Sequence, residues 1–272
     1  MSAEHRLLVI DIDGTLLNRR GEVSTVDRAA VERARRAGIR VSLSTGRVVE
    51  ACRRVLDYLG LDGYHMFFDG AFVVNPLSRE EVYAEPIPRE LVREMIGFTH
   101  EHGIDMELYS SERYFLERHT WSADIRRAFF DLEPEVADFH RVWQKERVLK
   151  ATLAVRSPEE KAQSALFQQH FGVRLHFSWT QTPAYPDVGF INVINAAASK
   201  GRALEELAAF LGIPLEGTAA IGDGGNDVSL LARAGLGIAM SDAPDELKGV
   251  ADHVVTDVEH NGVAEAIERF LL

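Results

Sequence analysis

The stretch Leu7-Leu8-Val9-Ile10-Asp11-Ile12-Asp13-Gly14-Thr15 joins a short apolar run to two carboxylates. A continuous apolar run of this length is typical of a strand buried on both faces of a parallel sheet. Because residues i and i+2 of a strand point to the same side, we expect the carboxylates of Asp11 and Asp13 to share one spot. Two acids so close repel unless they share a proton or a cation lies between them, which predicts a site for a hard cation such as Mg²⁺. The alternative interpretation is an ordinary strand-to-helix turn with two solvated acids.

The sequence that follows alternates between helical and strand patterns. Ser24 or Thr25 begins a predicted helix that Gly38 ends, a strand covers residues 39–43, and a second helix runs to about residue 59. This order favours a doubly wound parallel sheet of the α/β class. Ligands of such sheets bind beyond the carboxyl ends of the strands, where Ser44-Thr45-Gly46-Arg47 also falls. Its hydroxyls and guanidinium could bind phosphate oxygens, although ordinary helix capping by Ser44 or Thr45 explains the hydroxyls equally well.

The middle third of the chain changes to an α+β pattern. We predict a helix over residues 89–103, a hairpin of strands 106–109 and 114–116, a strand over 151–155, a helix over 158–171 and a strand over 173–179. From residue 199 the alternation of helices and strands resumes. We therefore predict a discontinuous core, residues 1–82 and 188–272, interrupted by an inserted α+β domain, residues 83–187.

The overall composition bounds the class of protein. At 272 residues, 46% apolar and 26% charged, the chain is long enough for two domains and is neither disordered nor fibrous. A formal net charge of −12 disfavours binding to nucleic acid or to an anionic membrane. The single cysteine, Cys52, can form no internal disulfide, and residues 1–6 lack the features of a signal peptide. We therefore expect a cytoplasmic protein without a membrane segment.

Two later clusters could carry chemistry. Asp223 stands in Gly222-Asp223-Gly224-Gly225-Asn226-Asp227, directly after an apolar strand, so its carboxylate can reach the same sheet edge as Asp11. The glycines leave backbone N–H groups that can face an anion, whereas Asp227 fits equally well as an ordinary acid in the first turn of a helix. Lys200 opens a helix in Ala198-Ser199-Lys200-Gly201, where a cation opposes the helix dipole, so an anionic partner is expected. The simpler interpretation of Lys200 is a solvated surface lysine.

Taken together, these four clusters make the sequence similar to the haloacid dehalogenase (HAD) superfamily of phosphatases. The resemblance is to the Cof-like subfamily IIB, whose members carry an α/β type II cap. The matching motifs stand in order along the chain: Asp11-Ile12-Asp13-Gly14-Thr15-Leu16-Leu17, Ser44-Thr45-Gly46-Arg47, Ser199-Lys200-Gly201 and Gly222-Asp223-Gly224-Gly225-Asn226-Asp227. The resemblance spans nearly the whole chain and implies a Rossmann-like, HAD-type core with the inserted domain as its cap.

The resemblance also implies a role for each motif residue in a Mg²⁺-dependent phosphomonoesterase. Asp11 would be the nucleophile that forms an aspartyl-phosphate, and Asp13 the general acid and base. Lys200 would neutralise charge between Asp11 and the phosphoryl group. The substrate phosphate would be bound by Gly14, Thr45, Gly46, Arg47, Lys200 and Asn226. The metal would be held by Asp11, by Asp13 through its main-chain carbonyl, and by Asp223, with Asp227 in support.

The sequence departs from the family pattern at three places outside these motifs. Asp69-Gly70-Ala71 stands where the family often has Asn-Gly-Ala, and Ser241-Asp242-Ala243 stands where it has Gly-Asn-Ala. Asn192 stands where the family commonly has an acid. We expect the first two departures to leave the four motifs untouched and the third to affect the support around Lys200.

The resemblance leaves the substrate open within a class. A small phosphorylated metabolite is expected, above all a sugar phosphate, with nucleotides, phosphoglycerates, pyridoxal phosphate and flavin mononucleotide as alternatives. A phosphotransferase or mutase that uses the same aspartyl-phosphate, and a non-catalytic phosphate-binding protein, are the competing functions. Candidate cap contacts are Glu107, Tyr109, Arg113, His119, Trp121, Arg126, Trp143, His176 and Trp179, although aromatic residues at such spacing more often form core.

Overall fold

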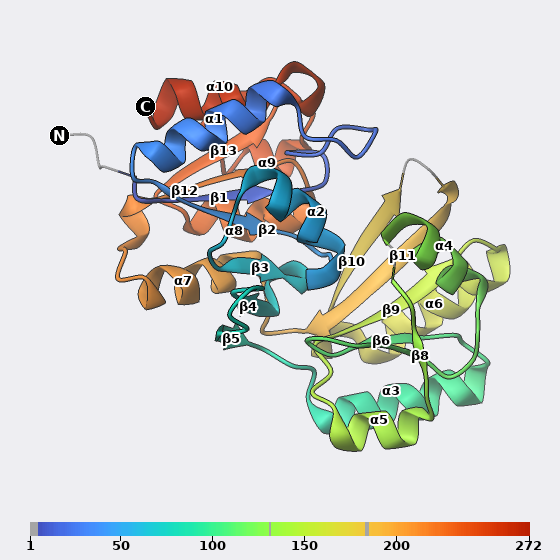
Figure 1. Cartoon of the computed structure of the whole chain (residues 1–272). Helices are drawn as coiled ribbons and strands as arrows, with labels where there is room; N and C mark the ends of the chain where they lie inside the picture. Colours follow the sequence, from blue (N-terminus) through green and yellow to red (C-terminus); the bar gives the residue numbers. More distant parts are fainter. Residues whose placement is uncertain (1–4, 131, 183–184) are drawn as a thin grey trace. The chain divides into compact units, whose positions relative to one another are not determined.

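The computed structural model describes residues 5–130, 132–182 and 185–272, and it divides into two compact units (Figure 1). The first unit comprises Met1–Arg47, Cys52–Tyr83 and Ser199–Leu272, and the second comprises Val48–Ala51 and Ala84–Ala198. The first unit is thus discontinuous in sequence. Within the described residues, no helix combines the length and the apolar character needed to cross a membrane.

The first unit is built on an eight-stranded sheet in the order β14-β13-β12-β1-β2-β3-β4-β5. Its strands are β1 Leu7–Asp11, β2 Arg40–Ser44, β3 His65–Phe67, β4 Phe72–Val74, β5 Glu81–Ala84, β12 Thr218–Gly222, β13 Leu236–Met240 and β14 His253–Val255. The strands from β14 to β3 run parallel, and β4 pairs antiparallel with β3. Every residue of β1 is buried, because the strand lies between β12 and β2 with helices above and below.

Helices cover both faces of this sheet. They are α1 Thr25–Arg36, α2 Val49–Leu59, α7 Lys200–Phe210, α8 Val228–Arg233, α9 Asp245–Lys248 and α10 Gly262–Phe270. Residues of α7, α8 and α9 pack with Leu7 and Val9 on one face. The alternate strand residues Leu8 and Ile10 point to the other face, where α1 and α10 lie together (Figure 1). The predicted α/β core with a doubly wound parallel sheet is therefore confirmed.

The second unit holds a six-stranded sheet in the order β10-β11-β9-β6-β7-β8. Its strands are β6 Glu107–Tyr109, β7 Tyr114–Leu116, β8 Glu135–Val136, β9 Lys150–Val155, β10 Leu175–Thr182 and β11 Tyr185–Asn195. Neighbouring strands run antiparallel except β7 and β8. Its helices are α3 Arg89–His102, α4 Trp121–Phe130, α5 Phe139–Lys145 and α6 Pro158–Phe171. Apolar residues of α3, α5 and α6 form one core with Leu108, Ala151 and Ile191 of the sheet.

The α+β character of this unit agrees with the sequence pattern, and α3, α6, β9 and the hairpin β6–β7 occur close to their predicted residues. The pattern does not predict α4, α5 or the length of β11. Helical periodicity cannot be established over helices as short as α4 and α5. The predicted boundary between residues 187 and 188 falls inside β11, which pairs with β9 and β10 and belongs to the second unit.

Candidate active site

The carboxyl edge of the first sheet brings the first and the fourth motif together. β1 ends at Asp11, and its neighbour β12 ends at Gly222, directly before Asp223. The two strands pair in parallel with Ile10 opposite Ile221, so both leave the sheet at the same edge. Acidic residues that are far apart in the sequence therefore meet there.

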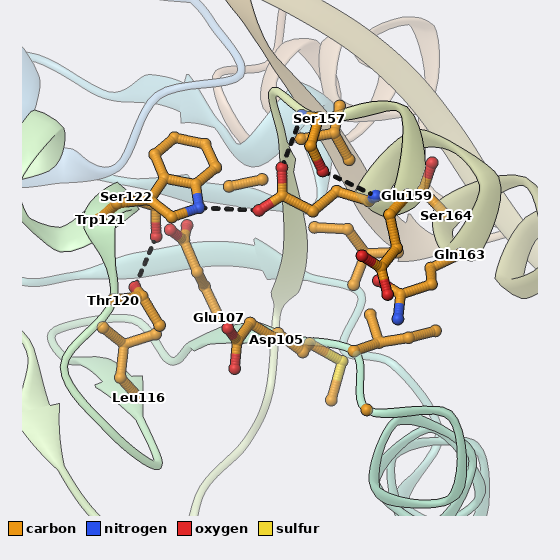
Figure 2. A pocket seen from close by; sticks show the side chains of 17 residues that line it. Asp105, Glu107, Leu116, Thr120, Trp121, Ser122, Ser157, Glu159, Gln163 and Ser164 are labelled. Atoms are coloured by element: carbon orange, nitrogen blue, oxygen red, sulfur yellow. Dashed lines mark hydrogen bonds between the residues drawn. The ribbon is translucent and has the colours of Figure 1, made fainter.

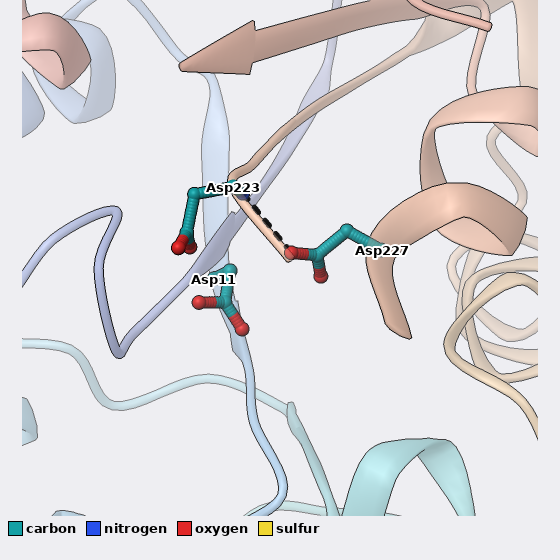
Figure 3. A group of neighbouring side chains, drawn as sticks. All are labelled: Asp11, Asp223 and Asp227. Carbon is teal, nitrogen blue, oxygen red and sulfur yellow. Dashed lines mark hydrogen bonds between the residues drawn. The ribbon is translucent and has the colours of Figure 1, made fainter. Parts of the chain in front are cut away.

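Three carboxylates, those of Asp11, Asp223 and Asp227, form one group at this edge (Figure 3). One ligand atom from each lies within 4.8 Å of the others. Asp11 and Asp227 are buried, and Asp223 is half-buried. Such a group could hold a metal ion.

A buried lysine bridges two of these acids. Lys200 Nζ donates hydrogen bonds to Asp11 Oδ1 at 2.5 Å and to Asp227 Oδ1 at 2.7 Å, and its side chain is 1% exposed. The Ser199 hydroxyl caps α7 by accepting from the Arg202 N–H, which fixes the start of the helix. Burial alone would lower the pKa of Lys200, but the carboxylates of Asp11 and Asp227 outweigh it and hold the pKa above its ordinary value. The interpretation of Lys200 as a solvated surface lysine is therefore wrong.

Residues Gly14 and Thr15 hold the Asp223 carboxylate from the other side. The Thr15 hydroxyl donates to Asp223 Oδ1 at 2.7 Å. Gly14 has a φ of +90°, and a β-carbon there would lie 2.2 Å from Asp223 Oδ2. Only glycine satisfies both the left-handed backbone and this close approach.

Asp227 organises the glycine-rich turn from within the 3₁₀ helix Gly225–Asp227. Its Oδ2 accepts from the N–H of Asp223 at 3.1 Å (Figure 3). The same oxygen accepts from the N–H of Gly224 at 3.0 Å. No side-chain capping bond is made to α8, although Asp227 immediately precedes that helix. The interpretation of Asp227 as an acid in the first turn of a helix therefore holds for this 3₁₀ helix, and Asp227 in addition accepts from Lys200. The N–H of Gly224 faces this carboxylate instead of an external anion.

The donor set at this edge fits a hard divalent cation. Burial raises the pKa of Asp223 to about 6, with Asp227 adding to the rise and the Thr15 hydroxyl opposing it. Burial, followed by the Asp227 carboxylate, also raises the pKa of Asp11 well above its usual range, although Lys200 opposes this. Burial is the main cause of both shifts, and neighbouring carboxylates add a surplus of negative charge. Mg²⁺ binds carboxylate oxygens of this kind and would offset that surplus.

The carboxylate of Asp13 is placed differently from the expectation. β1 ends at Asp11, so the alternation of side chains along a strand does not extend to Asp13, which lies in the following turn. The Asp13 side chain is 57% exposed and forms an ion pair with Arg47. Arg47 Nε donates to Asp13 Oδ2 at 2.8 Å, and Arg47 Nη2 donates to Asp13 Oδ1. The carboxylate is therefore not part of the three-acid group.

The second motif forms a tight loop after β2. Thr45 is buried, and its Oγ1 accepts from the Arg47 N–H at 3.1 Å. The neighbouring Ser44 hydroxyl is also buried and, among the residues that the structure describes, has no hydrogen-bond partner. Both hydroxyls lie at the carboxyl edge of the sheet, because Ser44 ends β2 opposite Asp11.

Two of the departures from the family pattern, Asp69 and Asp242, interact with residues of the fourth motif. Asn226 Nδ2 donates to Asp69 Oδ1 at 2.8 Å, and the charge of Asp242 helps to raise the pKa of Asp223, after burial and Asp227. The expectation that these departures leave the motifs untouched is therefore wrong. Asn192, in contrast, lies in the second unit, where it donates to Thr180 Oγ1 at 3.3 Å. The sequence marks Asp69 as a departure from the family pattern but gives it no role, because nothing in its segment shows that Asn226 is its partner.

The candidate cap residues divide into a cluster and a set of separate contacts. Glu107, Tyr109 and Arg126 are buried and bonded together: Arg126 Nη2 donates to Glu107 at 2.9 Å and the Tyr109 hydroxyl donates at 2.6 Å. Three of the others make polar contacts within the second unit: Arg113 with Glu135 and Glu146, His119 with Asp124, and Trp121 with Glu160. Trp143 packs against the apolar core, and Trp179 packs against Gly189. His176 is exposed on β10.

A cavity of about 240 Å³ lies within the second unit, where several acidic side chains line it (Figure 2). Three of its acids have protein partners: Glu107 pairs with Arg126, Asp105 with Arg118, and Glu160 accepts from the Trp121 indole and the Ser157 N–H. The three-acid group lies in the first unit. There the single buried cation Lys200 is bonded to two of three carboxylates, so negative charge is in excess, which is not the case for the Glu107–Arg126 pair at the cavity. We therefore place the candidate active site at Asp11 and not at the cavity.

Comparison with known proteins gives the class to which this fold and site belong. The haloacid dehalogenase-like hydrolase family matches residues 8–267, so the chain belongs to this family. Phosphatase YwpJ of Bacillus subtilis (strain 168) is 30% identical over 295 residues, covering 98% of this chain and 100% of the relative. A phosphoglycolate phosphatase of Metallosphaera sedula is 30% identical over 270 residues, covering 98% of this chain and 99% of the relative.

The solved structures agree with this class. One of them, described as a HAD subclass IIB sugar phosphatase, matches with a TM-score of 0.78 and 25% identity, covering 97% of this chain and 98% of its own. The resemblance to Cof-like subfamily IIB is thereby confirmed, and with it the expectation of a hydrolase from this superfamily of phosphatases.

Proposed function

We propose that the chain is a Mg²⁺-dependent phosphomonoesterase that hydrolyses a small phosphorylated metabolite through an aspartyl-phosphate intermediate. The observation that carries the proposal is the buried Lys200 ammonium, bonded to Asp11 and Asp227 at an edge shared with Asp223. A phosphate monoester is anionic, so it can approach carboxylates only where positive charge is built in. Phosphoryl transfer is catalysed mainly by such positioning and electrostatic stabilisation.

Asp11 is the nucleophile in this proposal. Its Oδ1 accepts from Lys200, so we assign the attack on phosphorus to Oδ2. The bond from Oδ2 to phosphorus forms while the bond from phosphorus to the leaving oxygen breaks, which yields an alcohol and a covalent acyl phosphate. Water then attacks phosphorus, and inorganic phosphate and the free Asp11 carboxylate are released.

Asp13 moves the proton in both steps. Its carboxyl group donates a proton to the leaving oxygen, and the resulting carboxylate then takes a proton from the attacking water. The forked contact with Arg47 occupies both oxygens of Asp13, so in this proposal Arg47 releases one of them before Asp13 carries the proton. Arg47 therefore acts on Asp13 in addition to its proposed role at the phosphate.

The remaining motif residues bind the phosphate and the metal. We assign the phosphate oxygens to the hydroxyl of Thr45, the backbone of Gly14 and Gly46, and the side chains of Arg47, Lys200 and Asn226. When bound, Mg²⁺ supplies positive charge that offsets the repulsion between phosphate and carboxylates. The carboxylates of Asp11 and Asp223 and the main-chain carbonyl of Asp13 would hold it, with Asp227 supporting the turn that carries Asp223.

A sugar phosphate is the substrate class that we propose. It is supported by the solved relative described as a sugar phosphatase, while the Metallosphaera sedula relative is named for another small substrate, phosphoglycolate. The net charge of −12 also favours a small metabolite over a polyanionic nucleic acid.

Phosphate release from a panel of phosphorylated metabolites tests the proposal. We expect turnover that requires Mg²⁺, disappears in EDTA and is fastest with a sugar phosphate. Transfer of the phosphoryl group to a second sugar instead of to water would identify a phosphotransferase or mutase. Absence of turnover on the whole panel, with phosphate still bound, would identify a phosphate-binding protein.

A further inference from the structure

The turn between β3 and β4 contains a buried carboxylate that has no role in the proposed mechanism. Asp69 is 2% exposed and is the middle residue of the 3₁₀ turn Phe68–Gly70. Every residue of this turn has a positive φ, 54° at Phe68 and Asp69 and 92° at Gly70. This conformation is unfavourable for a bulky residue such as Phe68, so surrounding contacts must hold the turn in place. Backbone strain of this kind clusters at functional sites.

The turn supports the loop that follows β2. The Asp69 N–H donates to the Thr45 carbonyl at 3.0 Å, and the Phe68 N–H donates to the Arg47 carbonyl at 3.3 Å. The Asp69 carboxylate lies so close to Gly46 that a β-carbon at residue 46 would be 2.9 Å from a carboxylate oxygen. The proposed phosphate-binding backbone therefore rests directly on Asp69.

The same turn contacts two further motifs. A β-carbon at Gly70 would lie 2.3 Å from the Ser199 carbonyl oxygen, so the turn packs against the residue that precedes Lys200. The Asp69 carboxylate accepts from Asn226 Nδ2 at 2.8 Å and also acts electrostatically on Lys200. One three-residue turn thus contacts the second, third and fourth motifs.

We propose that Asp69 is a positioning residue that aims the Asn226 amide nitrogen and the Thr45-Gly46 backbone at the substrate phosphate. The inference rests on the proposed phosphatase function. An ionised carboxylate only accepts hydrogen bonds, so it holds the carboxamide of Asn226 with Nδ2 toward itself. The second hydrogen of that nitrogen is then directed to a phosphate oxygen, whereas a reversed amide would present its carbonyl oxygen and repel the phosphate.

The test measures the affinity of the full-length chain for inorganic phosphate by calorimetry with Mg²⁺ present, together with KM and kcat for the best substrate of the panel. Asp69→Asn keeps the size and one acceptor oxygen, so we expect phosphate Kd and KM to rise about threefold to tenfold, with a smaller change in kcat. Asp69→Ala removes the acceptor, and we expect a rise of about tenfold to 100-fold.

Two further variants separate positioning from stability. In an Asn226→Ala background, Asp69→Asn should change the phosphate Kd less than about twofold, because the contact through which it acts is gone. Asp27→Asn is the matched control, since Asp27 is a buried carboxylate of the same unit that accepts from the Ser24 hydroxyl and the Ala264 N–H. It should lower the Tm and leave the phosphate Kd unchanged.

The outcomes distinguish this inference from its competitors. If Asp69 contributed only negative charge, Asp69→Asn would bind phosphate more tightly, and that result would overturn the proposal. An unchanged Kd with a lowered Tm, as in the Asp27 control, would also overturn it in favour of a structural role. A wild-type chain that binds phosphate without turning over any substrate would refute the proposed function, while the phosphate Kd would still test Asp69.

Discussion

The two units each bury a cluster of charged side chains, and the clusters differ in their balance of charge. In the second unit one anion, Glu107, meets one cation, Arg126, at 2.9 Å. The Tyr109 hydroxyl donates to the same carboxylate at 2.6 Å. Every ionised group of this cluster therefore has a partner inside the unit.

In the first unit one cation meets several anions. Lys200 bridges Asp11 and Asp227, and the carboxylates of Asp223 and Asp69 belong to the same network of contacts. Buried negative charge in excess is costly unless something outside the chain compensates it. The comparison teaches that a buried ion pair does not by itself mark a site, whereas an unbalanced buried cluster does.

The largest effect is expected from Asp11→Asn in the unbalanced cluster. Turnover should fall roughly 10³-fold or more, because an amide cannot serve as the carboxylate nucleophile. Calorimetry in EDTA should show a Tm that is unchanged or raised, since the substitution removes one of the surplus charges. Turnover at the wild-type rate would exclude Asp11 as the nucleophile. A much lower Tm would contradict the inferred excess of buried negative charge around Lys200.

The corresponding carboxylate-to-amide substitution in the cluster of Glu107, Tyr109 and Arg126 should lower stability. Glu107→Gln leaves the Arg126 charge buried without an anion, so the second unit should lose about 3–5 kcal/mol of stability. All three tryptophans, Trp121, Trp143 and Trp179, lie in the second unit, so denaturation followed by their fluorescence reports on this unit.

An exposed ion pair of the second unit provides the control for Glu107. Glu133 pairs with Arg127 at the surface, where solvent screens the interaction. Glu133→Gln should therefore leave the fluorescence transition unchanged. If Glu107→Gln were as stable as this control, the buried pair would stabilise the second unit no more than the exposed pair does.

Mg²⁺ should stabilise the chain through the unbalanced cluster. A ligand that binds only the folded state at 100 times its Kd adds about 2.7 kcal/mol. We expect the Tm to rise along a magnesium titration, and further with inorganic phosphate present. The rise should be lost in Asp223→Asn, and a wild-type Tm that ignores magnesium would contradict the metal site.

Between pH 7 and pH 5, a buried neutral group gives the smallest effect. His65 is fully buried, its Nδ1 accepts from the Leu43 N–H at 3.0 Å, and burial lowers its pKa from 6.5 to about 3. The unfolded chain therefore binds more protons than the folded chain below pH 6.5. Stability should fall by roughly 1.4 kcal/mol for each pH unit between 6.5 and 3 through this group.

The measurement for His65 is the change in Tm between pH 7 and pH 5. His65→Gln should reduce this change, whereas His140→Gln, at an exposed histidine, should not. An identical pH dependence in the wild type and in His65→Gln would show that His65 does not limit stability in acid.

The residues of the unbalanced cluster were partly accessible from the sequence. The apolar run before Asp11 and the apolar strand before Asp223 predict that both acids reach one sheet edge, because strand ends are local signals. The position of the Asp13 side chain was not accessible, since it depends on β1 ending two residues earlier. Contacts such as that between Asp69 and Asn226 join distant segments, and no local pattern encodes them.

The second unit was predicted less completely for a physical reason. Long regular elements such as α3 and α6 leave a periodic signal that local reasoning detects. α4 is short, and its Arg126 is buried against Glu107 and the Phe190 ring. A charged residue on a helix predicts exposure, so tertiary contacts override the local pattern here.

The central position of β1 has a consequence for how the chain is made. Residues 7–10 pair with residues 218–221, and the segment that contributes most of the second unit lies between them. During synthesis, the second unit can emerge and fold while β1 still lacks its neighbour β12. The strand that carries the proposed nucleophile is therefore translated long before its neighbour β12, so the sheet edge at Asp11 is completed only after translation has passed residue 222.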